Sequence, residues 1–476
     1  MAGIEKLVQL AGVALFAVPG AALVELLPAL RALPWGQRLA YAYLLGVAFV
    51  AGGLYALSHF LAVPLRVPAI LTLALAPAGG WLAMAARHRF PRRADHPRGR
   101  RWNALQILAF GMAGVVFLSI LAEVFINPLR DWDGRMTWAA QARYMRAEGT
   151  VDPAALTQPG WYLTHSWYPA LMPVAQVAVL ELLRAGDDEH FFRAVYAFFF
   201  PVWLLILYGG ARRWASRNAA ALTTLAVALL PFPAIYRGGG AVSAYSDLPL
   251  ACFYGAGFLL LLALRPRLSA AVGGGLLLAA AALTKNEGAP LALWALSVAA
   301  FVSVFAGVPR RRLAGGRWRP YMLAAGIVLA ACVLLLSWRV GIPDRFESYR
   351  EIISWSTLWP GVITRVPLLL PKIRLQMLSL ADWGTFWLAA FVVLLAGWRG
   401  LRRRVTLPLL LAAAAPLGIA WIAYSVSLDP VESVRTSWNR FVLQASVPLM
   451  ILLTLAVDDV LCVLPGRWNR DRHLRP

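Results

Sequence analysis

Residues 103–125 of the chain read NALQILAFGMAGVVFLSILAEVF, a run in which Glu123 is the one charged side chain. A helix of about 20 apolar residues is long enough to cross the hydrocarbon core of a bilayer. Similar apolar runs lie at about 7–30, 38–62, 67–86, 191–210, 218–236, 248–264, 269–284, 288–307, 320–338, 376–397, 405–427 and 439–463. The sequence therefore predicts an all-α polytopic membrane protein with about 11–13 transmembrane helices.

The composition of the whole chain agrees with this prediction. Hydrophobic residues make up 60% of the 476 positions and charged residues 14%, and the mean hydropathy is +0.65. Soluble domains carry about 25% charged residues, so a soluble globule, a disordered chain and a coiled coil are excluded. Cys252, Cys332 and Cys462 fall inside apolar runs without the spacing of metal ligands. We expect them to be core residues that form no disulfide.

Basic residues give the chain a formal net charge of +22, and they lie between the apolar runs. Three of them are lysines (Lys6, Lys285 and Lys372), and the arginines gather at 87–101, 212–217, 265–267, 310–319, 399–404 and 467–475. Short loops rich in arginine stay in the cytoplasm and bind anionic lipid head groups. The charge therefore indicates membrane topology and membrane lipids as partners, and nucleic acid is excluded as a partner.

This charge pattern assigns a side of the membrane to each loop. With the arginine segments in the cytoplasm, external segments are expected at 126–167, 237–247, 284–288, 339–375 and 428–440, and the N-terminus is expected to be external as well. Residues 168–184 are apolar but do not fit as a full crossing, so we expect an interfacial or re-entrant helix there. The run at 7–30 is longer than the core of a signal peptide and is expected to be a retained span.

The first external segment contains two acids close to the membrane surface. Pro128 ends the preceding span, Asp131 and Asp133 follow in an Asp-Trp-Asp-Gly turn, and residues 136–145 suit a helix. A carboxylate there, flanked by arginines, has the properties of a general base. An acid before a helix is equally typical of an N-cap. Two acids without further ligands give weak support to a divalent cation.

Polar residues interrupt the apolar runs at two further places. Asp247 precedes a predicted helix and follows a glycine-rich segment, where it could cap the helix or face a ligand. Lys285 stands in the short segment Leu-Thr-Lys-Asn-Glu-Gly between two spans. Ionisable groups among membrane spans are costly and are commonly functional. Lys285 could bind a phosphate, or it could pair with Glu287 in a tight turn.

The last polar segment precedes the final span. Arg435 and Arg440 lie in it, with Thr436 and Ser437 as candidate helix caps. An external arginine can bind a phosphate through two hydrogen bonds or extend towards lipid head groups. His165 lies near a Tyr-Pro-Ala-Leu segment, and a lone histidine is more often a structural hydrogen-bonding residue than a base.

Residues 133–145, Asp-Gly-Arg-Met-Thr-Trp-Ala-Ala-Gln-Ala-Arg-Tyr-Met, resemble the first external loop of the GT-C superfamily of membrane glycosyltransferases. They are most similar to the group that uses lipid-phosphate sugars, which includes protein mannosyltransferases and aminoarabinose transferases. In that group an Asp, usually in Asp-Glu, opens an amphipathic helix, and a Pro-Leu motif opens the next membrane segment. His165-Ser-Trp-Tyr-Pro-Ala-Leu171 stands in the corresponding place, and the resemblance spans roughly 127–290. Gly134 replaces the usual second acid.

The resemblance implies a GT-C-like bundle with external juxtamembrane helices. It divides the chain into an N-terminal three-span extension at 1–102, a catalytic core at 103–310 and C-terminal helices at 311–476. It also implies an inverting glycosyltransferase that moves a sugar from a polyprenyl-phosphate donor to a glycan, lipid or protein acceptor. The reaction would take place at the outer face of the bacterial inner membrane.

The resemblance also implies roles for individual residues. Asp133 would be the general base, with Asp131 as the alternative and Asp247 in a supporting role. Substrate binding would involve Lys285, Glu287, Arg435, Arg440, His165, Tyr168 and Tyr245, with Lys285 and Arg440 favoured as the phosphate ligands. No cofactor is expected. This interpretation requires Asp133, Lys285 and Arg440 to meet around one pocket.

Two other classes of protein share the same general pattern. A secondary transporter or a lipid flippase is also polytopic, although transporters commonly contain two repeated halves, and no convincing repeat is visible in this sequence. A lipid-binding assembly subunit is the non-enzymatic alternative. The sequence lacks a phosphate-binding Gly-Lys-Ser/Thr loop and a dinucleotide glycine motif, which disfavours nucleotide hydrolysis and a sugar-nucleotide donor.

Overall fold

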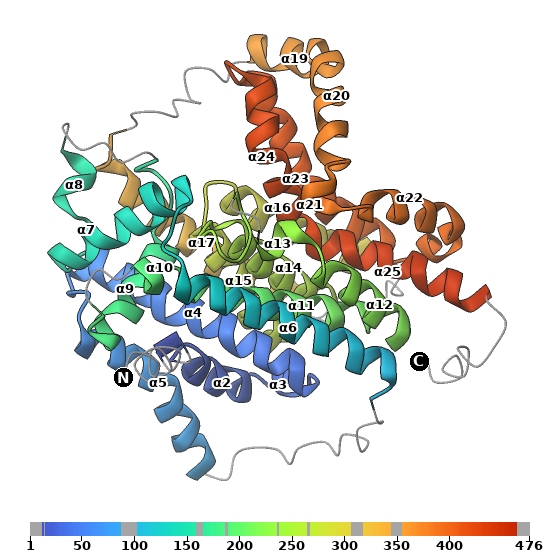
Figure 1. Ribbon diagram of the computed structural model, residues 1–476. Helices are drawn as coiled ribbons and strands as arrows, with labels where there is room; N and C mark the ends of the chain where they lie inside the picture. The colour runs from blue at the N-terminus through green and yellow to red at the C-terminus, as the bar shows by residue number, and fades with distance from the viewer. Residues whose placement is uncertain are drawn as a thin grey trace.

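The computed structural model of the protein describes residues 12–13, 15–86, 102–158, 165–185, 189–235, 238–263, 267–305, 318–343 and 355–463. The regular elements in these residues are all helices, which confirms the predicted all-α polytopic membrane protein (Figure 1). Within the same residues, seven helical segments are long and apolar enough to cross a membrane. They are α4 (Trp35–Leu61), α5 (Val67–Ala86), α6 (Ala104–Ile126), the segment Phe192–Ala211 made by α10 (Glu189–Ala197) and α11 (Phe199–Ala211), α17 (Trp318–Val340), α23 (Thr406–Val426) and α25 (Ser446–Val463).

Three shorter apolar helices follow one another in the middle of the bundle (Figure 1): α14 (Asp247–Ala263), α15 (Leu268–Ala282) and α16 (Gly288–Phe305). Residues 247–261 of α14 are all buried, and the helix packs against α11, α15, α16 and α24 (Pro430–Gln444). A helix that is apolar all round is stable only when other elements surround it. α14 is therefore the central helix of the protein, and its first residue, Asp247, begins inside the core.

Besides the run at 191–210, which α10 and α11 share, four of the predicted single spans are interrupted in the structure. The described part of the run at 7–30 breaks into α2 (Ala17–Leu26) and α3 (Pro28–Arg31), and the run at 218–236 breaks into α12 (Arg217–Ala228) and α13 (Pro231–Ala234). Pro28 and Pro231 open the second helix of each pair. Proline disfavours the helical conformation in the residue before it, so a helix commonly ends there.

The other two interruptions lie in the C-terminal part of the chain. The run at 376–397 contains the end of α20 (Val366–Met377), α21 (Leu380–Trp383) and α22 (Phe386–Ala396), and Gly384 between the last two has φ +55°. The run at 439–463 contains the end of α24 and the whole of α25. Pro448 lies in the first turn of α25. If α24 and α25 formed one continuous helix, the ring of Pro448 would clash with the carbonyl group four residues earlier.

The segments predicted to be external are more helical than expected. Residues 126–167 contain a π-helix, η1 (Gly134–Ala139), followed by α7 (Ala140–Glu148) and α8 (Ala154–Thr157), so the predicted helix at 136–145 is confirmed. Residues 428–440 were expected to be a loop, but α24 begins at Pro430, and Asp429 caps it by accepting a hydrogen bond from the Glu432 N–H. Residues 339–375 include α19 (Trp355–Thr364), which precedes α20.

The segment 168–184, expected to be an interfacial or re-entrant helix, contains α9 (Leu171–Leu183). Residues 171–180 of this helix are all buried, and α9 packs against α4, α7 and α10. α9 is therefore covered by protein over these residues, and its position relative to the membrane stays a prediction.

Two of the arginine segments meet at one end of the bundle. Arg403 donates a hydrogen bond to the Trp214 carbonyl and forms an ion pair of 2.7 Å with Asp458, a buried residue of α25. Asp458 also accepts a hydrogen bond from the Ser216 N–H. Arg213 donates to the Leu259 carbonyl near the C-terminal end of α14. The predicted cytoplasmic segments 212–217 and 399–404 therefore lie at the opposite end of α14 from Asp247. The segments 87–101, 265–266, 310–317 and 467–475 lie outside the described residues.

Candidate functional site

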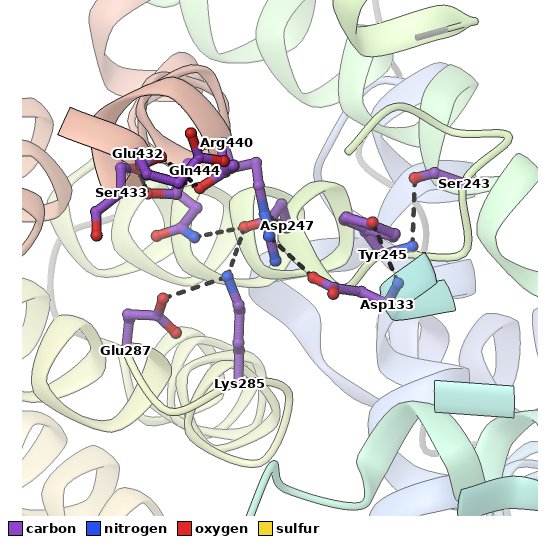
Figure 2. A network of polar contacts seen from close by, with 12 residues as sticks. Asp133, Ser243, Tyr245, Asp247, Lys285, Glu287, Glu432, Ser433, Arg440 and Gln444 are labelled. Atoms are coloured by element: carbon purple, nitrogen blue, oxygen red, sulfur yellow. Dashed lines mark hydrogen bonds and ion pairs between the residues drawn. The ribbon is translucent and has the colours of Figure 1, made fainter. Parts of the chain in front are cut away.

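A buried carboxylate at the N-terminal end of α14 is the centre of a polar network (Figure 2). The Asp247 side chain has no exposed surface. Its Oδ1 atom accepts hydrogen bonds from Lys285 Nζ at 2.9 Å and from Gln444 Nε2 at 2.7 Å, and its Oδ2 atom accepts one from Arg440 Nε at 2.9 Å. Asp247 thereby joins α14 to α24 and to the turn between α15 and α16.

Lys285 lies in that turn with 3% of its side chain exposed. Besides Asp247, it contacts Glu287 Oε1 at 3.2 Å. The predicted pairing of Lys285 with Glu287 is therefore present, and Asp247 is a second and more deeply buried partner. A buried ammonium group needs such counter-charges, since removing it from water is costly.

Arg440 extends from α24 and binds two acids at once. Its Nε atom contacts Asp247, and its Nη1 atom contacts Asp133 Oδ2 at 2.9 Å. The guanidinium carbon lies 4.7 Å from the centre of the Tyr245 ring, a distance typical of a cation–π contact. Gln444 is one helical turn further along α24, so both side chains leave the same face of the helix.

Asp133 immediately precedes the π-helix η1 and comes from a distant part of the chain. A Cβ atom on the next residue, Gly134, would lie 2.1 Å from the Ser243 carbonyl oxygen, so only glycine allows the two loops to approach this closely. This contact explains why no second acid follows Asp133. The Asp133 N–H also donates to the Tyr245 hydroxyl at 3.2 Å. Burial raises the pKa of Tyr245 above its usual value, so the hydroxyl stays protonated at neutral pH.

Asp133, Lys285, Glu287 and Arg440 are charged residues that line a cavity of about 700 Å³. Its other lining residues include apolar side chains, several of them on α23, and side chains with hydroxyl groups. The apolar residues are Pro290, Ile419, Ile422, Ala423, Val426, Leu428 and Phe441, and the hydroxyl groups belong to Tyr424, Ser427, Ser433, Thr436 and Ser437. A ligand that fits this cavity would therefore have charged, hydroxyl-bearing and apolar parts.

The structure brings most of the predicted site residues together. Asp133, Asp247, Lys285, Glu287, Arg440 and Tyr245 belong to the network, and His165 and Tyr168 line the cavity with their rings 5.0 Å apart. The required meeting of Asp133, Lys285 and Arg440 around one pocket is thus observed. Asp247 is covered by its three donors and lies beneath the cavity surface, so it holds the cations rather than facing a ligand.

Two predicted residues lie apart from the network. Asp131 is buried but does not line the cavity. Arg435 is 68% exposed and pairs with Glu432 on the surface of α24. Thr436 and Ser437, expected to cap the helix, lie inside it and donate to the carbonyl groups of Glu432 and Ser433, because α24 begins earlier than predicted.

Gln444 is the residue of the network that the sequence analysis missed. Its spacing of four residues from Arg440 was the available signal, because side chains four residues apart share a helix face. Asn439, next to Arg440, points elsewhere: it donates to Asp382 Oδ2 at 2.9 Å and accepts from Trp383 Nε1 at 3.0 Å. Adjacent residues of α24 are thus bonded to α14 on one side and to α21 on the other.

Among the described residues, no group of three or more His, Cys, Asp or Glu side chains is placed to hold a metal ion. Comparisons of the chain with models of protein families, with curated proteins and with solved structures find no match. The resemblance to the GT-C superfamily therefore rests on the sequence motifs alone.

The role of Asp247 gives a prediction about stability. Asp247→Asn should lower the free energy of unfolding by about 3–5 kcal/mol, because it leaves two buried cations without their shared counter-charge. Thermal unfolding in detergent measures the effect. Glu432→Gln is the matched control, since it breaks an exposed ion pair on α24 and should change the melting temperature little. Equal shifts for the two variants would contradict a central role for Asp247.

Proposed function

We propose that the protein is a GT-C-type membrane glycosyltransferase that transfers a sugar from a polyprenyl-phosphate donor to an acceptor hydroxyl. The observation that supports this most is the cavity in which Asp133, Lys285 and Arg440 meet and which apolar side chains also line. A lipid-linked sugar phosphate has matching parts, namely an anionic phosphate, a ring with hydroxyl groups and a long apolar tail.

Asp133 is the proposed general base. Asp133 lines the cavity, and it belongs to the sequence motif that resembles the GT-C superfamily. Its side chain is 18% exposed. In the proposed reaction its carboxylate takes the proton of the acceptor hydroxyl. The acceptor oxygen then bonds to the anomeric carbon, the bond from that carbon to the phosphate oxygen breaks, and the lipid phosphate leaves with the electron pair.

Lys285 and Arg440 are the proposed phosphate ligands. A leaving phosphate carries a negative charge, and cations fixed beforehand stabilise such charge without having to reorganise during the reaction. Asp247 fixes both: it accepts one hydrogen bond from each of them and has no exposed surface of its own. A guanidinium has five N–H donors, so Arg440 can bind a phosphate while it keeps Asp247.

The site is proposed to face the outer side of a bacterial inner membrane. The arginine segments 212–217 and 399–404 lie at the far end of α14, and such segments favour the cytoplasm. α14 has 17 residues, which corresponds to a length of about 25 Å and is comparable with the hydrocarbon thickness.

Cysteine labelling tests this orientation. Asp152→Cys places a thiol on the side of the site, on a side chain that is 43% exposed, and Arg404→Cys places one at the opposite end. A membrane-impermeant maleimide added to intact cells should label the first variant, and the second only after permeabilisation. The unmodified protein controls for its three native cysteines. The reverse pattern would place the site in the cytoplasm.

Replacement of the proposed base tests the reaction. Asp133→Asn should abolish sugar transfer from a polyprenyl-phosphate donor, because an amide cannot accept the proton, while binding of the lipid persists. Product formation in proteoliposomes measures transfer, with Asp152→Asn on the same external segment as the control. Full activity of Asp133→Asn would remove it as the base, and loss of activity in Asp131→Asn alone would move that role to its neighbour.

Two arginines on α24 form a matched pair for the phosphate site. Arg440→Gln should weaken binding of undecaprenyl phosphate by about tenfold to a hundredfold, the range expected for a lost charge-assisted hydrogen bond. Arg435→Gln should leave binding unchanged, because this side chain lies on the exposed surface. Binding to the purified protein in lipid nanodiscs gives both values. Equal losses would indicate a general attraction of the helix for anionic lipid.

The same measurements separate a transferase from a transporter or flippase. A flippase would move the glycolipid between leaflets with its sugar–phosphate bond intact, and its activity would not require an acceptor. Release of sugar-free lipid phosphate only when an acceptor is present supports the transferase.

A further inference from the structure

Glu287 is an acid of the cavity with one buried oxygen that has no hydrogen-bond partner among the described residues. Its Oε1 atom contacts Lys285 Nζ at 3.2 Å, and its Oε2 atom is buried and has no hydrogen-bond partner among the residues that the structure describes. The side chain lines the cavity and is 15% exposed. A buried acceptor without a hydrogen-bond partner is unfavourable, and more so when it is charged. Such a cost at the wall of a cavity points to a partner supplied by a ligand.

Lys285 has a second acidic partner besides Glu287. Asp247 binds the same ammonium group at 2.9 Å and is more deeply buried than Glu287. Helix capping does not explain Glu287, although it directly precedes α16. Glutamate is not among the residues favoured at an N-cap, which are Ser, Thr, Asp and Asn. The pairing with Lys285 uses one oxygen of Glu287, and neither this pairing nor helix capping uses the other oxygen.

The backbone holds Glu287 firmly at the cavity wall. A Cβ atom on the next residue, Gly288, would lie 1.8 Å from the Ala281 carbonyl oxygen, so the turn packs tightly onto the end of α15. Only the side chain can adjust, and the terminal torsion of glutamate rotates easily. A small rotation would bring the second oxygen to the cavity without moving the main chain.

The cavity wall formed by α23 and α24 is rich in hydroxyl groups. The Tyr424 and Ser437 hydroxyls lie 2.9 Å apart, and the Ser427 and Ser433 hydroxyls lie 2.7 Å apart. These groups both donate and accept hydrogen bonds. They line the same cavity as Glu287 and suit a ring that bears several hydroxyl groups.

We propose that Glu287 determines sugar specificity by accepting a hydrogen bond from a donor group on the sugar ring, either a hydroxyl or an ammonium group. This inference rests on the proposed function, since it assumes that the cavity holds a lipid-linked sugar phosphate. The sugar-binding part of the site then consists of Glu287 and the α23–α24 hydroxyl groups, beside the phosphate ligands Lys285 and Arg440.

Two substitutions separate recognition by Glu287 from support of Lys285. Glu287→Met keeps the length of the side chain but removes both oxygens. In Glu287→Gln the amide oxygen must face Lys285, because an ammonium group only donates. The amide nitrogen then occupies the position of Oε2. A sugar hydroxyl can reverse its hydrogen bond and accept from this nitrogen, whereas an ammonium group cannot.

The experiment compares three lipids in nanodiscs: undecaprenyl phosphate, undecaprenyl-phosphate glucose and undecaprenyl-phosphate glucosamine. We expect the wild-type protein to bind at least one glycosylated lipid about tenfold to a hundredfold more tightly than the sugar-free lipid.

Glu287→Met should remove this gain in affinity and leave the affinity for undecaprenyl phosphate unchanged. Glu287→Gln should keep part of the gain if the donor is a hydroxyl and lose all of it if the donor is an ammonium group. Glu432→Met, on the exposed side of α24, is the control.

The outcomes distinguish this inference from the proposed function. If undecaprenyl phosphate fails to bind the wild-type protein, the proposed function fails. If it binds but a sugar adds no affinity, or if Glu287→Met keeps the whole gain, the role of Glu287 is overturned and the phosphate site remains. Equal losses for all three lipids would mean that Glu287 acts through Lys285 alone, which also overturns the inference. Melting temperatures show whether each variant is folded, and Glu287→Gln serves as the test if Glu287→Met is not.

Discussion

The polar site depends on one buried carboxylate, that of Asp247. Two cations, Lys285 and Arg440, come within 2.9 Å of it from different parts of the chain, in a protein interior where an isolated charge is strongly disfavoured. Because each cation requires the same acid, the end of α24 and the turn after α15 must meet at the start of α14. Asp133 is bound to Arg440 and Glu287 to Lys285, so these two acids meet at the same place.

The acids of the network divide into two kinds. Asp247 is fully covered and accepts three hydrogen bonds, so it serves the other residues of the site. Asp133 and Glu287 line the cavity, and each engages a cation through one oxygen. The proposed chemistry assigns one of them to the acceptor and the other to the sugar. The same residue type thus takes different roles according to its burial and its partners.

Much of the fold follows from the sequence, because apolar runs and membrane-spanning helices obey the same length requirement. Four predicted spans are interrupted, at or near Pro28, Pro231, Gly384 and Pro448. At these places the backbone cannot continue as a regular helix, although the sequence stays apolar. Lys285 could be recognised as a site residue because a charge among apolar spans is costly. Arg435 and Arg440 could not be distinguished by composition. The two arginines lie on different sides of α24, one exposed and one facing the cavity. The predicted helix began at residue 439, so it did not contain Arg435 and could not show this difference.

The opposed bonding of Asn439 and Arg440 has a mechanical consequence. Asn439 is tied to Asp382 and Trp383, while the next residue is tied to Asp247, so α24 is anchored on two sides at the same level. Turning this helix about its own axis would break buried hydrogen bonds in both directions simultaneously. The part of the cavity lining that α24 supplies is therefore held in one rotational setting of the helix.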